Sequence, residues 1–335
     1  MWCLGNEMDG PWQTGHKTAH EYGRLAAETA RAMRQMQPDL ELVACGSSSS
    51  EMETFGDWEY EVLKEAYDLV DMISAHVYYW EQDGDVDSFL ASAVNMDRFI
   101  ESIAATADAV KAAGRHDKDI AISFDEWNVW YQKDTPSEPP TGDDWPIAPV
   151  LLEDNYSVLD AVVVGNLLIS LLKHADRVHA ASLAQLVNVI APIMTEPGGK
   201  AWKQAIFHPF AQAAEFAKGE VLQLDLDAPT HVTKKYGEVP LVDAVATLDE
   251  ETGSLSVFVV NRSTTEPFDL QLNLGDDFKL VEATTYFNED YNWKASVEDD
   301  SSVLPVPLEV TMETGQGASA VLPPVSWSVL RFSRS

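Results

Sequence analysis

The clearest fold signal in this chain is Ile120-Ala121-Ile122-Ser123-Phe124-Asp125-Glu126-Trp127-Asn128. The run begins with five mostly apolar residues, which is typical of a parallel strand buried on both faces. Glu126 therefore follows the carboxyl end of a strand. A second apolar run, Trp2-Cys3-Leu4, leads in the same way to Glu7. The sequence thus predicts two glutamates at the carboxyl ends of two different strands.

Paired carboxylates at such positions indicate a specific chemistry. In a barrel of alternating strands and helices, the active site is built at the carboxyl ends of the strands. A glycosidase needs two carboxyl groups there, one as acid/base and one as nucleophile or base. Either Glu7 or Glu126 alone would be interpreted as a helix cap or a solvated loop charge, but the pair favours catalysis.

Strand and helix signals alternate from residue 1 to about residue 217. Helices are expected at 16–37, 58–67, 87–113, 156–175 and 200–218. Further strands are expected at 41–45 and 72–78, and a strand leading into a loop at 178–189. Such alternation predicts a parallel sheet with helices outside it. A Pro-, Gly- and Asp-rich loop at 133–154 has the length of a lid or a binding loop.

The character of the sequence changes at Gly219. From there to Ser335, short alternating or β-branched runs are separated by turn residues, which is typical of an antiparallel β-sandwich. The fold prediction is therefore α/β followed by all-β. A catalytic domain would span 1–218 and a sandwich domain, which we interpret as structural, would span 219–335.

The charge of the chain is its second strong signal. The 335 residues include 55 acidic and 22 basic ones, which give a formal net charge of −33. The acids are spread along the whole sequence, so we interpret them as a halophilic surface adapted to molar salt, where screening weakens self-repulsion. Nucleic acids and anionic membranes are poor partners for such a field.

The two cysteines, Cys3 and Cys45, lie in apolar runs and are expected to be buried free thiols. The N-terminus has no secretory signal pattern, and no apolar run is long enough to span a membrane. The sequence therefore predicts a cytoplasmic protein.

Four strings resemble the α-L-arabinofuranosidases of glycoside hydrolase family 51. They are Trp2-Cys3-Leu4-Gly5-Asn6-Glu7-Met8-Asp9-Gly10-Pro11-Trp12, Ser74-Ala75-His76-Val77-Tyr78-Tyr79, Phe124-Asp125-Glu126-Trp127-Asn128-Val129-Trp130-Tyr131 and Ala184-Gln185-Leu186-Val187-Asn188-Val189. The resemblance extends over essentially the whole chain. It implies a (β/α)8 TIM barrel followed by a jelly-roll-like sandwich, and exo-acting hydrolysis of terminal α-L-arabinofuranosides in arabinan, arabinoxylan or arabino-oligosaccharides.

The resemblance also assigns roles to individual residues. Glu7 is implied to be the general acid/base at the end of barrel strand four, and Glu126 the nucleophile at the end of strand seven. The product should keep its anomeric configuration through a covalent arabinosyl-enzyme. Asn6 is implied to bind the sugar hydroxyl next to the anomeric carbon, Tyr78 to hold the nucleophile, and Gln185 to bind sugar.

Three further residues keep two interpretations each. His76 lies two residues before Tyr78 on the same strand face, so it either supports the site or fills the barrel core. Trp12 and Trp130 are either walls on which a sugar stacks or ordinary core aromatics. No phosphate loop, cysteine cluster or calcium loop is present in the sequence, and we expect neither a metal nor another cofactor to be needed for hydrolysis.

The chain departs from the family pattern at its beginning, because Trp2 already belongs to the run that matches barrel strand four. We therefore expect strands one to three to be absent, which would leave open strand edges. A homo-oligomer or a complementing N-terminal chain is the expected partner.

Two alternatives to the arabinofuranosidase hypothesis remain at this point. One is another glycosidase of the same clan, such as an endo-glucanase or a β-xylosidase. The other is an inactive or partner-dependent fragment of an arabinofuranosidase.

Overall fold

The computed structural model describes residues 1–131, 142–143, 145, 147, 149–274, 277–313 and 317–334. The chain forms two compact units, which we take in turn. The first comprises Met1–Tyr78, Asn95–Asn128 and His174–Ala184, and the second comprises Tyr79–Val94, Val129–Lys173 and Gln185–Ser335.

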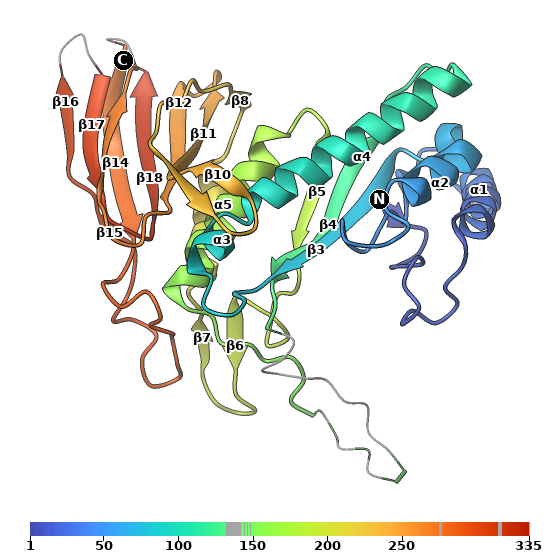
Figure 1. The fold of residues 1–335 in the computed structure, drawn as a ribbon, viewed down its shortest axis with the longest axis horizontal. Helices are drawn as coiled ribbons and strands as arrows, with labels where there is room; N and C mark the ends of the chain where they lie inside the picture. The colour runs from blue at the N-terminus through green and yellow to red at the C-terminus, as the bar shows by residue number, and fades with distance from the viewer. Residues whose placement is uncertain are drawn as a thin grey trace. The chain divides into compact units, whose positions relative to one another are not determined.

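The first unit is built on a parallel sheet. Its strands lie in the order β1-β2-β3-β4-β5, so neighbours in sequence are neighbours in space (Figure 1). The elements are β1 (Trp2–Cys3), α1 (Ala19–Met36), β2 (Leu42–Ala44), α2 (Asp57–Ala66), a 3-10 turn (Tyr67–Leu69), β3 (Met72–Tyr79), α4 (Ala93–Gly114), β4 (Ala121–Val129) and β5 (Val178–Leu183). This five-stranded half-barrel confirms the predicted fold of strands four to eight of a TIM barrel.

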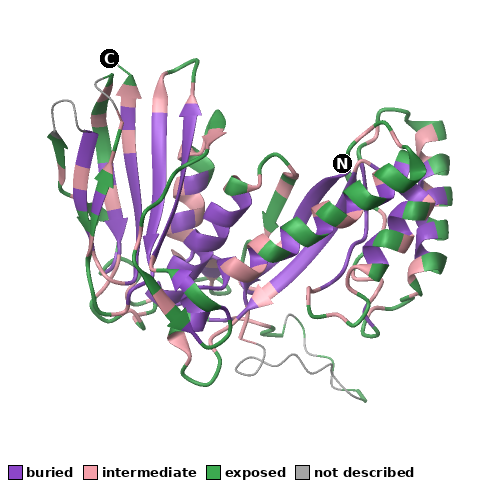
Figure 2. Cartoon of the chain, turned by 45° about the horizontal axis from the view of Figure 1, so that its top comes forward, coloured by how far each residue is buried: buried purple, intermediate pink, exposed green. Residues whose placement is uncertain are grey.

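Helix α1 shows how the sequence encodes these elements. Thr18 caps the helix: its side chain accepts a hydrogen bond from the backbone N–H of Glu21, and the Glu21 carboxylate accepts one from the backbone N–H of Thr18. This reciprocal capping box satisfies two amides that the helix leaves unpaired. The buried face contains Tyr22 and three alanines and packs on α2, whereas the opposite face is exposed (Figure 2).

The second unit begins with helices and a small hairpin and continues into the antiparallel sandwich. Its elements are α3 (Val86–Leu90), α5 (Val158–Lys173), β6 (Ile193–Thr195), β7 (Ala201–Lys203), α6 (Phe207–Phe216), β8 (Glu220–Leu222), β9 (Thr230–Thr233), β10 (Gly237–Pro240), β11 (Val242–Asp249), β12 (Ser254–Asn261), β13 (Phe268–Leu272), β14 (Phe278–Tyr286), β15 (Val306–Pro307), β16 (Val310–Glu313), β17 (Gly317–Leu322) and β18 (Ser326–Arg334).

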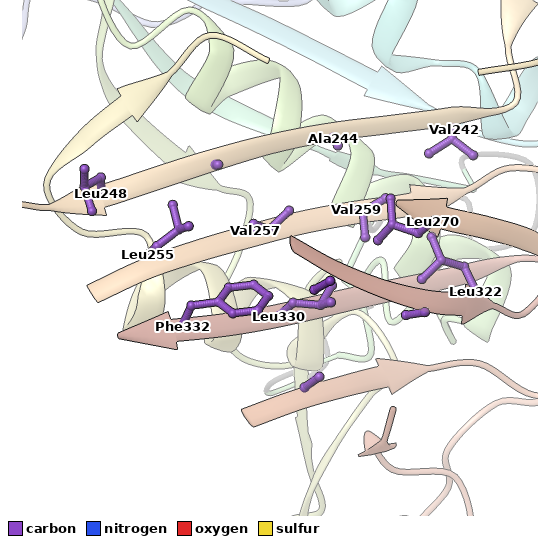
Figure 3. Close-up of a cluster of buried hydrophobic side chains, with 14 residues drawn as sticks. Val242, Ala244, Leu248, Leu255, Val257, Val259, Leu270, Leu322, Leu330 and Phe332 are labelled. Carbon is purple, nitrogen blue, oxygen red and sulfur yellow. The ribbon is translucent and has the colours of Figure 1, made fainter. Parts of the chain in front are cut away.

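The sandwich confirms the all-β prediction for the C-terminal part of the chain. A six-stranded sheet in the order β15-β14-β18-β12-β11-β8 faces a three-stranded sheet in the order β13-β17-β16. Alternate residues of both sheets fill the space between them, among them Val257, Leu270, Leu322 and Phe332 (Figure 3). Burying this apolar surface is what holds the two sheets together.

Helix α5 packs on β11, β12 and β18 of the six-stranded sheet. It is buried along nearly its whole length, in contrast to α1 (Figure 2). Gly165 is needed at the contact, because a Cβ atom there would lie 2.4 Å from the Trp327 ring. The predicted domain boundary at residue 218 runs between α6 and the sandwich strands and stays a prediction.

Several sequence predictions about local structure were wrong. Cys3 is exposed, because β1 is a two-residue strand at the edge of the sheet with only β2 beside it, whereas Cys45 is buried as expected. The helix predicted at 200–218 begins only at Phe207, since residues 201–203 pair with 193–195 as a hairpin. As expected, the strand that begins at residue 178 leads into a loop, and β5 ends at Leu183.

Of the predicted loop at 133–154, positions 133–141, 144, 146 and 148 lie outside the described residues. Within the described part of the chain, no helix combines the length and the apolar character that crossing a membrane requires.

Candidate active site

Glu7 is held at the end of β1 by an ordered turn. Its backbone has a φ of 45°, which is uncommon for a residue with a side chain and is often found at functional sites. The Met8 amide donates to Cys45 Sγ at 3.4 Å, and the Ser48 amide donates to Asp9 Oδ2 at 2.9 Å. The segment after β1 is therefore fixed to the loop that follows β2.

Strand β3 supplies His76 and Tyr78. Residues two apart along a strand point to the same face, so both side chains leave the sheet in the same direction. The His76 side chain is 6% exposed and therefore almost completely withdrawn from solvent.

Strand β4 supplies two acidic neighbours, Asp125 and Glu126. In a regular strand their side chains would point to opposite faces. The pairing of β4 with β5 is irregular between Phe124 and Trp127, and such a bulge redirects side chains. As a result, both carboxylates reach His76.

His76 lies at the centre of the site. Its Nδ1 atom is 3.2 Å from Glu7 Oε1 and 3.3 Å from Glu126 Oε2, and its Nε2 atom is 3.0 Å from Asp125 Oδ1. One carboxylate oxygen of Glu7, one of Glu126 and a ring nitrogen of His76 all lie within 4.8 Å of one another. Three acidic side chains thus share a single imidazole.

The outer oxygens of both glutamates are held as well. The Trp12 indole N–H donates to Glu7 Oε2 at 2.5 Å, and the Tyr78 hydroxyl donates to Glu126 Oε1 at 2.6 Å. Asp125 Oδ2 accepts from Ser123 Oγ at 3.2 Å and lies 3.3 Å from Cys3 Sγ. Each acidic group of the site is therefore fixed in orientation by a donor.

The electrostatics of the site favour a protonated His76. Burial lowers the pKa of His76, but its hydrogen bonds to Asp125 and Glu7 and the negative charge of Glu126 outweigh this and raise the pKa to about 10. His76 is therefore an imidazolium at neutral pH.

The same contacts act on Glu7 in the opposite direction. Burial raises the pKa of Glu7, but the hydrogen bonds from His76 and Trp12 and the charge of His76 lower it overall. The Tyr78 hydroxyl has a raised pKa because of its burial and its proximity to Glu126, so it remains a hydrogen-bond donor. Glu7 is thus ionised in this arrangement.

The structure brings together five of the predicted site residues, namely Glu7, Glu126, His76, Tyr78 and Trp12. Trp12 is 60% exposed, and it contacts Glu7 through its indole N–H. Asn6 is exposed immediately before Glu7. Trp130 and Gln185 belong to the second unit, so their approach to the carboxylates stays a prediction.

Sequence reasoning missed Asp125. The residue stands directly before Glu126, and strict alternation along a strand would turn it away from the site. The only signal available was its place within the acidic pair at the end of an apolar run.

A half-barrel of parallel strands that brings two glutamates together at the carboxyl ends of its strands fits a glycoside hydrolase. Comparison with known families agrees, since residues 125–326 match the family described as the α-L-arabinofuranosidase C-terminal domain. The chain belongs to the α-L-arabinofuranosidases of glycoside hydrolase family 51.

Similar proteins support this membership. The chain is 56% identical to an intracellular exo-α-(1→5)-L-arabinofuranosidase from Streptomyces lividans, over 99% of this chain and 50% of that protein. It is 54% identical to an exo-α-(1→6)-L-arabinofuranosidase from Bifidobacterium longum, over 98% of this chain and 65% of the relative. It spans between half and two thirds of the length of these two relatives.

A solved structure gives the same result in three dimensions. A family 51 α-L-arabinofuranosidase from Bifidobacterium longum superposes with a TM-score of 0.93 at 44% identity, covering 99% of this chain and 66% of the other. The half-barrel and the sandwich are therefore both features that this chain shares with the family.

Proposed function

We propose that this chain carries the catalytic pair of a retaining exo-α-L-arabinofuranosidase. The substrates would be terminal non-reducing α-L-arabinofuranosides in arabinan, arabinoxylan or arabino-oligosaccharides. The main support is the approach of Glu7 and Glu126, whose facing oxygens lie within 4.8 Å of one another. Retaining enzymes hold their carboxyl groups about 5–5.5 Å apart, whereas inverting enzymes need about 6.5–9.5 Å to admit a water molecule.

Glu126 is the proposed nucleophile. Its carboxylate would attack the anomeric carbon and form a covalent arabinosyl ester while the bond to the leaving group breaks. The hydroxyl of Tyr78 donates to Glu126 Oε1, which leaves the Oε2 atom as the attacking oxygen. Asn6, directly before Glu7, is proposed to bind the hydroxyl beside the anomeric carbon.

Glu7 is the proposed general acid, which requires it to carry a proton when the leaving group departs. Its lowered pKa in the free site works against this role. His76 Nδ1 lies 3.2 Å from Glu7 and can supply the proton. As Glu126 turns into a neutral ester, His76 loses one of the charges that raise its pKa, so transfer of the proton to Glu7 becomes easier.

The second half of the reaction reverses these roles. Glu7, now ionised, would remove a proton from water, and the resulting hydroxide equivalent would attack the anomeric carbon and release Glu126. Two inversions at the same carbon give net retention. Gln185, Trp130 and the exposed ring of Trp12 are proposed to bind the sugar around this centre.

The preferred linkage is proposed from the relatives. The two relatives at 56% and 54% identity are named for (1→5) and (1→6) linkages respectively. We propose that the chain acts on arabinofuranosyl side groups or termini in either linkage.

We also propose an intracellular location, as in the name of the Streptomyces relative. A homo-oligomer or a complementing chain is the proposed partner.

The test is hydrolysis of p-nitrophenyl α-L-arabinofuranoside by the purified chain in molar KCl, followed by proton NMR. Retention predicts that α-arabinofuranose is the first product and that the β-anomer appears later by mutarotation. Parallel assays with (1→5)- and (1→6)-linked arabinofuranosyl disaccharides and with p-nitrophenyl β-xyloside define the specificity.

Three outcomes would contradict the proposal. The β-anomer as first product would mean inversion, and faster cleavage of the xyloside would indicate another glycosidase of the clan. Absence of hydrolysis by folded protein would leave the chain as a non-catalytic family member.

A further inference from the structure

We propose that Glu7, His76 and Glu126 also form a binding site for a divalent transition-metal cation, with Zn²⁺ as the best match. Each residue offers one ligand atom, and the three atoms lie within 4.8 Å of one another. The separations from His76 Nδ1 are 3.2 Å to Glu7 Oε1 and 3.3 Å to Glu126 Oε2. Zn²⁺ binds imidazole nitrogen and carboxylate oxygen at about 2.0–2.2 Å, so neighbouring ligands of a tetrahedral site are about 3.3–3.5 Å apart.

The hydrogen-bond partners of these three ligands also fit a metal site. A metal-binding histidine almost always donates its other ring N–H to a carboxylate or carbonyl group, which fixes the tautomer and the ring orientation. The His76 Nε2 atom has such a partner in Asp125 Oδ1, 3.0 Å away. The second oxygens of Glu7 and Glu126 are likewise held, by Trp12 and Tyr78. Each ligand is therefore oriented before a metal arrives.

Burial and charge are also suited to a cation. The exposed fractions are 6% for the His76 side chain, 16% for Glu7 and 28% for Glu126, so the site is sheltered but accessible from the side of Glu126. Three carboxylates surround one imidazole. A mixed nitrogen and oxygen set favours Zn²⁺ over Mg²⁺ and Ca²⁺, which prefer all-oxygen sites.

Binding is linked to pH, because the ligating atom of an imidazole must be free of a proton, so the site should bind Zn²⁺ more tightly as the pH rises. No bond is oxidised or reduced. Because the ion occupies the same oxygens as the proposed reaction, Zn²⁺ and arabinofuranoside would exclude each other; only this last step rests on the proposed function.

Direct measurement of metal binding keeps the test independent of catalysis. The chain in molar KCl with excess Mg²⁺, which saturates weak sites on the acidic surface, competes with a chromophoric chelator for Zn²⁺. We expect one tightly bound Zn²⁺ per chain. The variant His76→Gln should lose this site, with affinity at least about 100-fold weaker.

Two further variants sharpen the result. Asp125→Asn keeps all three ligands and removes only the charge behind the imidazole, so affinity should fall by about 10–100-fold. His174→Gln is the matched control, because His174 Nε2 contacts a single carboxylate, Asp97, at 3.2 Å. It should bind Zn²⁺ as tightly as the unaltered chain.

The proposal is overturned if the unaltered chain binds no stoichiometric Zn²⁺ in this competition, or if His76→Gln binds it equally well. Circular dichroism checks that each variant is folded. If His76→Gln does not fold, Asp125→Asn and Glu126→Gln decide the matter, since neither should leave the affinity unchanged. A lack of arabinofuranosidase activity would not affect these measurements.

Discussion

Two sheltered clusters of charged side chains in this protein have opposite charge balance. In the first unit, Glu7, Asp125 and Glu126 surround the single imidazole of His76. In the second unit, one carboxylate, Asp243, is shared by several donors. Lys173 Nζ contacts its Oδ1, the Asn166 amide donates to Oδ2 at 2.8 Å, and Arg262 Nη2 lies 3.5 Å from Oδ2.

We interpret the difference as one between a structural cluster and the proposed catalytic one. The Asp243 cluster has a surplus of cations over one anion, and it joins α5 to β11 and to the end of β12. In the His76 cluster, three carboxylates meet one imidazole, so anions are in surplus among the described residues. Gathering like charges in a sheltered place is costly, and such perturbed groups are common at functional sites.

The largest expected effect is a loss of activity when a carboxylate of the His76 cluster is removed. Glu126→Ala should lower kcat for p-nitrophenyl α-L-arabinofuranoside on the order of 10⁴-fold or more, because no other group can form the covalent ester. Its free energy of unfolding should change little. Glu101→Gln, an exposed carboxylate on α4, is the control and should keep full activity. Equal activity of the two variants would end the proposed role of Glu126.

The next largest effect is a loss of stability when the carboxylate of the Asp243 cluster is removed. Asp243→Ala leaves Lys173 and Arg262 without their shared anion, and removing one partner of a buried ionic group costs about 3–5 kcal/mol. Urea unfolding should show this loss relative to Asp269→Ala, an exposed position on β13. A loss below about 1 kcal/mol would mean that Asp243 is not a structural centre.

Dependence on pH provides a third distinction. The pKa of His76 is raised to about 10, so the protonated imidazole stabilises the folded state fully below about pH 6.5, the ordinary value. This contribution is lost as the pH rises through 10. The free energy of unfolding should fall with pH by at most about 1.4 kcal/mol per pH unit in this range. The His76→Gln variant should not show this fall. Identical pH profiles of stability for the two proteins would refute the imidazolium.

The smallest effect concerns the outer oxygen of Glu7. Trp12→Phe removes the indole N–H, which helps to lower the pKa of Glu7, so that pKa should rise. The titration of the Glu7 carboxyl group, followed by carbon-13 NMR, should move to higher pH by about one unit or less, because Trp12 is well exposed. An unmoved titration would show that Trp12 does not act on Glu7.

The sequence was sufficient for the architecture. Strand–helix alternation and short β-branched runs predicted the parallel sheet and the sandwich, because both depend on periodicity that the residues display directly, and the resemblance to family 51 implied the barrel. Glu7 and Glu126 were singled out because they follow apolar runs, whereas Tyr78 was singled out through the resemblance. The signals for the two glutamates are local and need no knowledge of how strands pair.

The features that the sequence did not predict depend on how strands pair and on which strands lie at the edge of the sheet. The role of Asp125 arises from a bulge between β4 and β5, and pairing irregularities leave no trace in alternation. Cys3 was expected to be buried because its neighbours are apolar, but its strand lies at an edge. The position of His76 between the two glutamates depends on three strands meeting, which no spacing in the chain reveals.

The most direct test of the central claim is to trap the covalent intermediate. In Glu7→Ala, an activated 2,4-dinitrophenyl α-L-arabinofuranoside needs no acid for departure of its leaving group, whereas water attack lacks its base. Peptide mass mapping should then find one anhydropentose attached to Glu126. An arabinosyl group on any other residue, or none in folded protein that releases dinitrophenol, would contradict the account.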